Sequence, residues 1–406
     1  MSAGPGRGPP ARGRGPAGCH WAADGLPVPV RRAERLTPRR ARLATPGPRS
    51  GNDYLGLATH AEVRGAAAAA ARAHGMGRRG SALVCGYSPE HAALERELAE
   101  LKGAEACLLF PTGFAANSGV LAALAGSDRV TVFSDALNHA SIVDGARLAA
   151  KGGVALQVYR HKDLDHLREL LAACRTPLKL VVTDTMFSMD GDTADLRGLA
   201  ALKAEHDFLL VADEAHGTLV FGRGAGGGVA QLQGAEAGVD VHVGTLSKAF
   251  GCLGGFAACS RPVRELLATK ARPFVFSTAL PLPVVAAARA ALRVARRDGD
   301  ALRAKLFRNI NLLRNGLGLG GSSSPIVPLV LGTEARALAA SAALRREGFH
   351  VTAIRPPTVP PGTARLRVAL SAAHTTGEVL GLVDALRRLG LTPAAAAAGP
   401  GLVAKL

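Results

Sequence analysis

From about residue 51 onward, the chain alternates short apolar runs with longer segments whose apolar residues recur at helical spacing. The helix-like segments include 163–174 and 195–206. Apolar, β-rich runs occur at 129–133, 156–159, 178–184, 208–213, 239–244 and 255–259. Such alternation is typical of an α/β domain with a mainly parallel sheet, whose strands are apolar because helices cover both faces. The pattern therefore predicts this fold class.

The pattern changes after a long helix that we expect at 281–297. Strand-like and helix-like segments then follow at 325–331, 334–348, 365–370 and 376–390. They predict a smaller α+β domain. We therefore divide the folded part into a large domain at 51–285 and a small C-terminal domain at 286–390.

The two ends of the chain show no sustained apolar period. Residues 1–50 hold ten arginines against Asp24 and Glu34, among many glycines and prolines, and residues 391–406 are rich in Ala, Gly and Pro. Segments of this composition cannot bury enough apolar surface to fold alone, so we predict a disordered leader and a flexible tail. The leader can equally be an organelle transit peptide or the product of a misassigned start site.

The formal net charge of +17 raises the question of a nucleic-acid partner. Almost half of the excess lies in residues 1–50, and aromatic residues make up only 4% of the chain. A basic stripe on a helix and a stacking platform for bases are both lacking, so nucleic-acid binding remains a weak alternative that depends on the leader. No stretch of about 18 or more apolar residues occurs, so no membrane span is predicted.

The spacing of the six cysteines indicates neither disulfide bonds nor metal ligation. None belongs to a C-x-x-C pair, and Cys107 and Cys259 lie in apolar runs that are typical of buried segments. The spacing therefore favours neither a disulfide framework nor a zinc site, and no other metal site is predicted. A reducing compartment fits this usage.

Two polar residues stand at and just after the end of the apolar run 208–213. Asp213 ends the run and His216 comes three residues later, which places both at the carboxyl edge of the sheet, where open α/β folds bind ligands. Lys248 follows the next strand-like run, 239–244, among small and hydroxyl residues. A reactive amine, a carboxylate and phosphate donors are what a pyridoxal-phosphate site needs. Each residue alone could be an ordinary surface lysine or strand-end Asp, so the hypothesis depends on their occurring together.

A glycine-rich stretch at 221–229 offers a competing interpretation, because it satisfies the G-x-G-x-x-G pattern of dinucleotide-binding sites. That function requires a helix that begins within the glycines. Gly226, Gly227 and Gly228 follow one another, and a helix there would be costly. A flexible loop near the active site is the better prediction.

The chain resembles the α-oxoamine synthases, fold type I pyridoxal-phosphate enzymes, over roughly residues 51–390. The order and spacing of eight motifs make the resemblance specific. They are SGNDYLGL (50–57), PTGFAAN (111–117), SDALNHASIVDG (134–145), FSMDGD (187–192), DEAHG (213–217), GTLSKAFG (244–251), FVFSTALP (274–281) and PTVPPGTARLRVALSAAH (357–374). Within the family, the stretches 75–87 and 245–260 resemble plant and green-algal sequences.

The resemblance implies roles for the residues around the cofactor ring. Lys248 is expected to bond covalently to the cofactor and then to move protons at the substrate Cα. Asp213 is expected to pair with the pyridine nitrogen, and His216 to reach the phenolic oxygen. His139 is expected to stack on the ring, and Ser188 to support the hydrogen bonds on the oxygen side. His139 could also be a core histidine and Ser188 a turn residue.

The resemblance also implies a phosphate site and a shared active site. Gly113 and Phe114 match positions whose backbone amides bind the phosphate at a helix N-terminus, where such an anion is favoured. Thr245 is expected to donate to the same phosphate. Thr278 matches a residue that does so from a neighbouring subunit, so the resemblance implies a homodimer.

The substrates that the resemblance implies are an amino acid and an acyl thioester. Arg367 matches the arginine that binds the amino-acid carboxylate, and Asn52 is expected to line that pocket; Arg365 or Arg367 could instead be solvated. The motifs favour the branch that condenses L-alanine with a pimeloyl thioester of coenzyme A or an acyl carrier protein, with loss of carbon dioxide. Branches that use acetyl-CoA with glycine, succinyl-CoA or palmitoyl-CoA are the alternatives.

A non-catalytic homologue is an alternative from another class. Such proteins commonly lack the lysine or the aspartate, and this chain has both Lys248 and Asp213. The family's usual N-terminal helix and strand, with an arginine that often meets the far carboxylate of the substrate, have no assignable counterpart before residue 50.

The last three residues, Ala404-Lys405-Leu406, resemble the S-K-L address of peroxisomal proteins. They follow an Ala, Gly and Pro tail that a receptor could reach. We therefore expect a peroxisomal enzyme, with the cytosol as the alternative.

Overall fold

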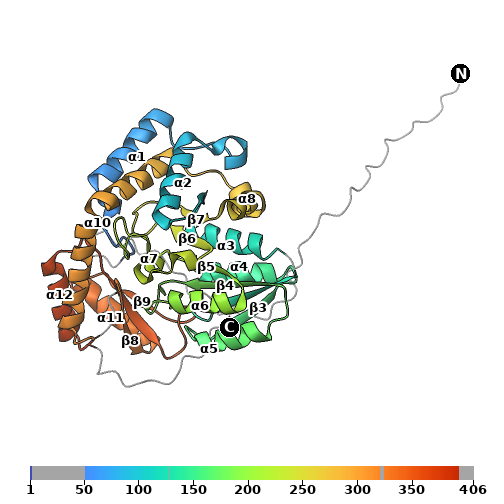
Figure 1. Cartoon of the computed structure of the whole chain (residues 1–406). Coiled ribbons are helices and arrows are strands. Elements are labelled where there is room, and N and C mark those ends of the chain that lie inside the picture. Colours follow the sequence, from blue (N-terminus) through green and yellow to red (C-terminus); the bar gives the residue numbers. More distant parts are fainter. Residues whose placement is uncertain (2–50, 127, 321–323, 393–406) are drawn as a thin grey trace. The chain divides into compact units, whose positions relative to one another are not determined.

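The computed structural model describes Met1 and residues 51–126, 128–320 and 324–392. The predicted leader, apart from Met1, and the terminal Ala404-Lys405-Leu406 lie outside the described residues. Within the described part, the fold is built on a seven-stranded sheet with helices on both faces (Figure 1).

The large sheet is mainly parallel, as the sequence predicts. Five of its strands run parallel to their neighbours, and β7 lies antiparallel between β1 and β6. The strand order is β1 (Ala106–Phe110), β7 (Gly255–Cys259), β6 (Val241–Thr245), β5 (Leu209–Asp213), β4 (Leu178–Asp184), β2 (Val130–Asp135) and β3 (Ala155–Tyr159). The pattern of apolar runs found all of these strands except β1. The α/β fold class is confirmed.

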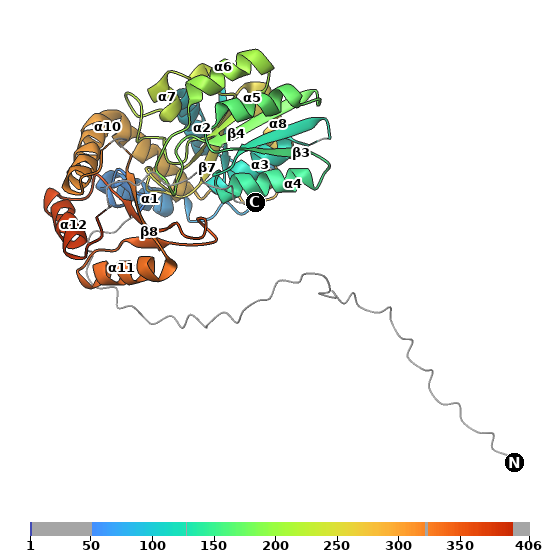
Figure 2. The ribbon, with the colours of Figure 1, turned by 90° about the horizontal axis from the view of Figure 1, so that it is seen from below.

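Helices cover both faces of this sheet because its strands are apolar on both sides. One face packs against α3 (Gly113–Leu124), α4 (Ala140–Ala150) and α8 (Arg261–Lys270). The other face packs against α2 (Pro89–Lys102), α5 (Leu164–Ala173), α6 (Leu196–His206) and α7 (Val229–Gln233), as Figure 2 shows for most of these helices. The helices α3 and α4 begin at the carboxyl ends of β1 and β2, so their N-termini point toward one edge of the sheet.

The predicted linking helix is longer than its apolar pattern indicates. It forms α10 (Leu282–Gly316), so the expected end at 297 is wrong. The sequence Asp298-Gly299-Asp300 looks like a turn, but Gly299 is buried inside the helix. A Cβ there would lie 2.9 Å from a guanidinium nitrogen of Arg303, whose side chain donates to the carbonyl oxygen of Gly224. Glycine thus makes room for a contact that the sequence pattern does not reveal.

The helix α1 (Ala61–His74) lies along α10 (Figures 1 and 2). Its run of six alanines at 66–71 combines high helix propensity with small side chains, so the two helices can pack closely. The second sheet is antiparallel, with the order β8 (Ile326–Gly332), β10 (Ala364–Ala369) and β9 (Thr352–Ile354). The helices α11 (Glu334–Arg346) and α12 (Thr376–Arg388) pack beside it. The domain boundary at 285 lies inside α10 and stays a prediction.

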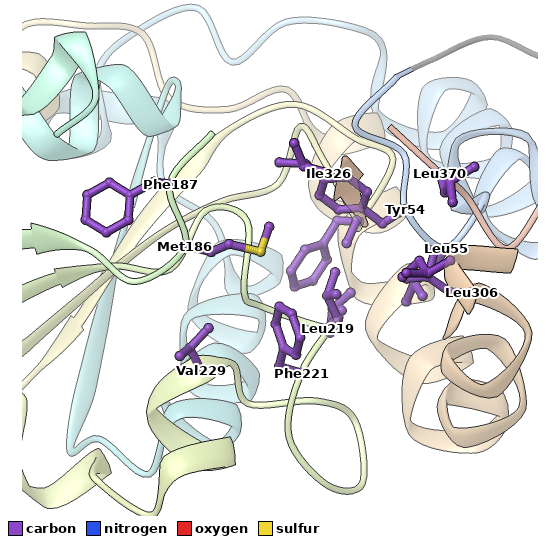
Figure 3. Packing of buried hydrophobic residues seen from close by; sticks show 14 of the residues in the cluster. Tyr54, Leu55, Met186, Phe187, Leu219, Phe221, Val229, Leu306, Ile326 and Leu370 are labelled. Carbon is purple, nitrogen blue, oxygen red and sulfur yellow. The ribbon is translucent and has the colours of Figure 1, made fainter. Parts of the chain in front are cut away.

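A continuous apolar core joins the second sheet to the large one. Tyr54 and Leu55 lie among side chains from the segment after β4, the loop after β5 and the start of β8 (Figure 3). Labelled members of this cluster are Met186, Leu219, Phe221, Leu306, Ile326 and Leu370. The segment 51–57 is therefore part of the core, and it brings its polar residues to the carboxyl edge of the large sheet.

None of the described helices combines the length and apolar character needed to cross a membrane. No group of three or more His, Cys, Asp or Glu side chains in the described ranges is arranged to hold a metal ion.

Candidate active site

The carboxyl edge of the large sheet gathers the chemically reactive residues. Asp213 is the last residue of β5 and Asp184 the last of β4, and the two are direct partners in the parallel register. Asp213 also pairs with Val243 on β6, which ends at Thr245, three residues before Lys248. Parallel pairing therefore brings Lys248 to the same edge as the two carboxylates.

The turn that carries Lys248 has a tightly constrained backbone. The carbonyl oxygen of Lys248 accepts a hydrogen bond from the Gly251 amide at 2.8 Å. Gly251 has a φ of +66°, and a Cβ there would lie 2.2 Å from the Ala58 nitrogen. Any larger residue at 251 would therefore displace either the lysine turn or the segment after Leu57.

Burial lowers the pKa of Lys248, and the nearby carboxylates of Asp213 and Asp184 oppose this shift. A lowered pKa raises the fraction of neutral amine near neutral pH. Only the neutral amine can attack an aldehyde, so the surroundings prepare Lys248 for covalent catalysis.

Asp213 is buried and its carboxylate is fixed by two hydrogen bonds. The amide of Asn117 on α3 donates to one carboxylate oxygen at 2.6 Å, and the backbone N–H of Ala215 donates to the other at 2.8 Å. Asn117 also donates to the Ser141 hydroxyl at 2.9 Å, while its own side-chain oxygen is buried without a hydrogen-bond partner in the described part of the chain. These contacts hold the carboxylate in one orientation.

His139 and Asp184 lie beside this carboxylate. The backbone N–H of His139, which caps α4, donates to Asp184 at 2.9 Å. The His139 ring bonds to the Ser141 hydroxyl at 2.8 Å. Burial lowers the pKa of His139; the Asp213 carboxylate opposes this shift, and the Lys248 charge adds to it. Burial and the Asp213 charge together raise the pKa of Asp184 well above its usual value.

His216 is held by Tyr54, a residue that the sequence did not single out. Its Nδ1 lies 2.6 Å from the Tyr54 hydroxyl, which is also 3.2 Å from the Asn52 side-chain oxygen. The hydroxyl has one proton, and when Tyr54 donates it to Nδ1 the other ring nitrogen of neutral His216 carries the proton. Burial and the charges of Lys248 and Arg367 lower the pKa of His216 well below its usual value. Burial raises the pKa of Tyr54 to about 12. Both side chains are therefore neutral near pH 7.

The N-terminus of α3 faces the end of β6. Thr112 caps the helix by accepting the Ala115 amide at 3.0 Å, which leaves the first amides, those of Gly113 and Phe114, without helical partners. A Cβ on Gly113 would lie 2.9 Å from the Thr245 Cβ, so only glycine allows this approach. The Phe114 side chain is exposed, and its contribution to an anion site is its backbone amide.

Arg367 lies on β10 and joins the second sheet to the site. Its Nε donates to the Ser188 carbonyl at 2.6 Å, and both terminal nitrogens donate to Asn52 at 3.1 Å. Ser188 thus contacts Arg367 through its backbone carbonyl, and its support of the hydrogen bonds on the oxygen side of the cofactor stays a prediction. Arg365, two residues away, is buried and bonds to Asp190 and to the Met189 carbonyl. Both arginines therefore form hydrogen bonds within the protein, so the alternative that one of them is only solvated is wrong.

Two features that the sequence analysis singled out, Thr278 and the glycine-rich stretch 221–229, are not members of this cluster. Thr278 is exposed and forms an isolated β-bridge with Ser81, and no hydrogen bond joins it to the other site residues within the described chain. In the glycine-rich stretch, α7 begins only at Val229 and has five residues. A Cβ on Gly228 would lie 1.5 Å from a carboxylate oxygen of Glu214, so this glycine packs directly on the residue after Asp213. The stretch is a loop beside the site, as predicted.

Asn117, Asp184 and Tyr54 are the functional neighbours that the sequence analysis missed. Asp184 ends the run 178–184 as Asp213 ends 208–213, so the shared sheet edge could have identified it. Asn117 and Tyr54 lie within the recognised motifs 111–117 and 50–57. Their partners, however, are 96 and 162 residues away, and only the fold shows those contacts.

Comparison with known proteins decides the family. The aminotransferase class I and II family model matches residues 50–386. An 8-amino-7-oxononanoate synthase of Arabidopsis thaliana is 50% identical over 351 residues, which cover 83% of this chain and 73% of the relative. One of Anaeromyxobacter dehalogenans (strain 2CP-1) is 54% identical over 340 residues, which cover 82% and 84%. The chain belongs to the α-oxoamine synthases.

Solved structures of this family share the fold. A serine palmitoyltransferase of Sphingomonas wittichii superposes with a TM-score of 0.80 at 35% identity, and the match covers 85% of this chain and 88% of that one. An 8-amino-7-oxononanoate synthase of Francisella tularensis superposes with a TM-score of 0.70 at 25% identity, with coverage of 84% and 96%. The α-oxoamine synthases are pyridoxal-phosphate enzymes, so the predicted family, fold and cofactor are confirmed.

The site of this α-oxoamine synthase fits pyridoxal phosphate. Lys248 offers the amine for the aldehyde, and Asp213 offers a fixed carboxylate for the pyridine nitrogen. The uncapped amides of Gly113 and Phe114, beside Thr245, offer an anion site at the start of α3. A Cβ on Gly255 would lie 2.6 Å from the Gly113 nitrogen, so small residues keep the backbone around that anion site tightly packed.

Replacement of Lys248 tests the covalent role. We expect Lys248→Ala to lose the visible absorbance band of the covalently bound cofactor, and to lose at least about a hundredfold in activity, because the proton-moving amine is absent. Lys270→Ala, at an exposed position on α8, is the matched control and should keep both. A Lys248→Ala protein that keeps the band would show that another lysine binds the cofactor.

The lowered pKa of His216 predicts a pH effect on stability. In the folded protein His216 stays neutral, whereas in the unfolded chain it takes up a proton below about pH 6.5. Its contribution to stability is therefore present above about pH 6.5 and is lost as the pH falls. Between pH 7.5 and 5.5 the cofactor-free protein should lose about 1 kcal/mol more free energy of unfolding than His216→Gln does. Equal losses in urea unfolding would contradict the assignment.

Proposed function

We propose that the protein condenses L-alanine with a pimeloyl thioester and releases 8-amino-7-oxononanoate, carbon dioxide and the thiol, a step of biotin biosynthesis. The observation that supports this choice most is the identity of 50% and 54% to 8-amino-7-oxononanoate synthases over most of the chain. The serine palmitoyltransferase with a TM-score of 0.80 is 35% identical. Fold similarity does not separate these activities, so the substrate choice depends on sequence.

The contacts of Arg367 support an amino-acid substrate. Its guanidinium points toward Asn52 and the Ser188 carbonyl, in the same region as Tyr54 and His216. A guanidinium can bind a carboxylate through two parallel hydrogen bonds. We infer that Arg367 and Asn52 hold the amino-acid carboxylate so that the Cα–H bond faces Lys248.

The residues around Lys248 perform the proton transfers. When bound, pyridoxal phosphate supplies an electron sink that stabilises negative charge at the substrate Cα. Lys248, once released from the cofactor, takes the proton from Cα and later returns one to the product. Asp213 keeps the ring nitrogen protonated, and neutral His216, oriented by Tyr54, is placed to bond the phenolic oxygen.

After the proton has left Cα, the condensation forms one carbon–carbon bond and breaks the thioester C–S bond and the bond from Cα to the carboxylate. The Cα carbon attacks the thioester carbonyl, and the sulfur of coenzyme A or of the acyl carrier protein leaves as a thiolate with the electron pair of the C–S bond and takes up a proton to give the thiol. The alanine carboxylate then leaves as carbon dioxide, and its bonding electrons return to the same carbon, which is reprotonated.

Substrate profiling tests the proposed function. Purified protein should release carbon dioxide from L-alanine with pimeloyl-CoA or pimeloyl-acyl carrier protein, and should turn over these pairs at least about tenfold faster than glycine with acetyl-CoA or L-serine with palmitoyl-CoA. Activity with one of the latter pairs alone would replace the proposal by another α-oxoamine synthase function. Omission of the amino acid is the blank.

A second copy of the chain is proposed to complete the site. Thr278 lies in a segment that bonds to residues 80–81, and exposed apolar side chains flank it on both sides of this contact: Leu83, Val84 and Phe276 are 57%, 82% and 68% exposed. Apolar clusters of this kind mark protein–protein contacts. We infer a homodimer in which Thr278 reaches the cofactor phosphate of the neighbouring subunit.

The dimer proposal predicts the effect of charge at this surface. Light scattering should give the molar mass of two chains for the native protein. Val84→Lys combined with Phe276→Lys should give monomers that lose activity, whereas Leu380→Lys on α12, also exposed, should change neither property. A fully active monomer would contradict the shared site.

We also propose a peroxisomal location, supported by Ala404-Lys405-Leu406 at the C-terminus. A fluorescent protein fused to the N-terminus should accumulate in peroxisomes. The same protein fused to the C-terminus masks the tripeptide and should stay diffuse in the cytosol. Identical distributions of the two fusions would refute the proposal.

A further inference from the structure

The loop between β4 and α6 connects the two sheets at the active site. On one side it bonds to β10: the Ser188 carbonyl accepts from Arg367 at 2.6 Å, and the Met189 carbonyl accepts from Arg365 at 3.2 Å. Gly191 packs on β8, where a Cβ would lie 2.3 Å from the Ile326 oxygen. The position of Arg367 therefore depends on the position of this loop.

His161 holds the other side of the loop. It follows β3, and its two ring nitrogens lie 2.9 Å from Asp135 at the end of β2 and 3.0 Å from Asp192 in the loop. The His161 ring also meets the Phe187 ring edge to face, with centroids 4.4 Å apart. His161 thus bridges the fixed edge of the large sheet and the loop that bears Ser188.

The bridge is strengthened by charge. Burial alone would lower the pKa of His161, but its hydrogen bonds to Asp135 and Asp192 outweigh burial and raise the pKa to about 9. At neutral pH both ring nitrogens therefore carry protons and donate to carboxylates, an arrangement that gives strong hydrogen bonds. Lys162 adds a second cation on Asp192 at 2.9 Å.

The backbone of the loop transmits the position of Asp192 to Ser188. The Phe187 amide donates to the Asp192 carbonyl at 2.9 Å, and the Gly191 amide donates to the Phe187 carbonyl at 2.8 Å. These two bonds close a turn from residue 187 to residue 192, and Ser188 lies inside it. A shift of Asp192 must therefore move the carbonyl oxygen that Arg367 uses as its anchor.

We propose that His161 is a positioning residue for the amino-acid substrate: by clamping Asp192 to Asp135 it fixes the Ser188 carbonyl, and through it the Arg367 guanidinium that binds the substrate carboxylate. The proposal rests on the proposed function, because it assigns the carboxylate of the amino acid to Arg367. It assigns His161 no contact with substrate or cofactor.

Binding of L-alanine without the acyl substrate tests this role. The binding is followed through the change that L-alanine causes in the visible spectrum of the bound cofactor. His161→Gln and Asp192→Asn should each raise the Kd for L-alanine about tenfold, with the cofactor band unchanged, since loss of an outer partner commonly costs ten- to a hundredfold. The double variant should be within about twofold of either single variant, because both changes break the same path.

Two reference variants complete the experiment. His166→Gln removes a neighbouring histidine that accepts from the Arg160 amide and has no bond to the loop, and it should leave the Kd unchanged. Arg367→Lys should raise the Kd at least as much as His161→Gln. A purely structural role would lower the thermal midpoint of the His161 and Asp192 variants and leave the Kd of the folded, cofactor-loaded enzyme within twofold of the native value, which would overturn the proposal.

Failure of the proposed function gives a different result. In that case the native protein shows no spectral response to L-alanine but responds to another amino acid, such as glycine or L-serine. The same variants are then compared with that amino acid, and a tenfold rise in its Kd still supports the role of His161, whereas an unchanged Kd refutes it.

Discussion

The structure depends on the burial of two adjacent carboxylates, Asp184 and Asp213, at the carboxyl edge of a parallel sheet. Parallel register makes them neighbours, and burial makes their charges costly unless partners are supplied. Asn117 and the His139 amide supply hydrogen bonds. Lys248 lies close enough that its charge, when the amine is protonated, lowers the pKa of Asp184 against the effect of burial. A cofactor whose ring nitrogen carries a proton adds a further favourable partner for Asp213. The need to compensate these charges explains why helices, turns and a lysine converge here.

The second sheet contributes the substrate end of the site through a shared core. Tyr54 packs in the apolar core that joins the two sheets (Figure 3). Its hydroxyl bonds to His216, and Asn52 beside it accepts from Arg367. One short segment therefore orients the groups on the oxygen side of the ring and the carboxylate-binding arginine. The loop that bears Ser188 joins the same arginine to the large sheet. The cofactor site and the amino-acid site are therefore joined by hydrogen bonds through the same short segment.

Much of this arrangement could be predicted from the sequence. The apolar runs located every strand of the large sheet except β1, and the residues that follow them gave Asp213, His216 and Lys248. Local patterns could not show that Gly299 allows α10 to continue, or which of Arg365 and Arg367 faces the site, because both answers depend on residues more than 70 positions away. The resemblance to the family chose Arg367, and the contacts with Asn52 and Ser188 agree with that choice.

The account depends most on the covalent partner of the cofactor. Reduction of the native enzyme with borohydride, followed by proteolysis and mass spectrometry, locates the lysine that carries the reduced pyridoxyl group. The surroundings of Lys248 predict that the modified peptide contains Lys248 and that other lysines, such as Lys102 and Lys270, stay unmodified. A pyridoxyl group on another lysine would contradict the central claim, and so would a cofactor-saturated enzyme without a modified lysine.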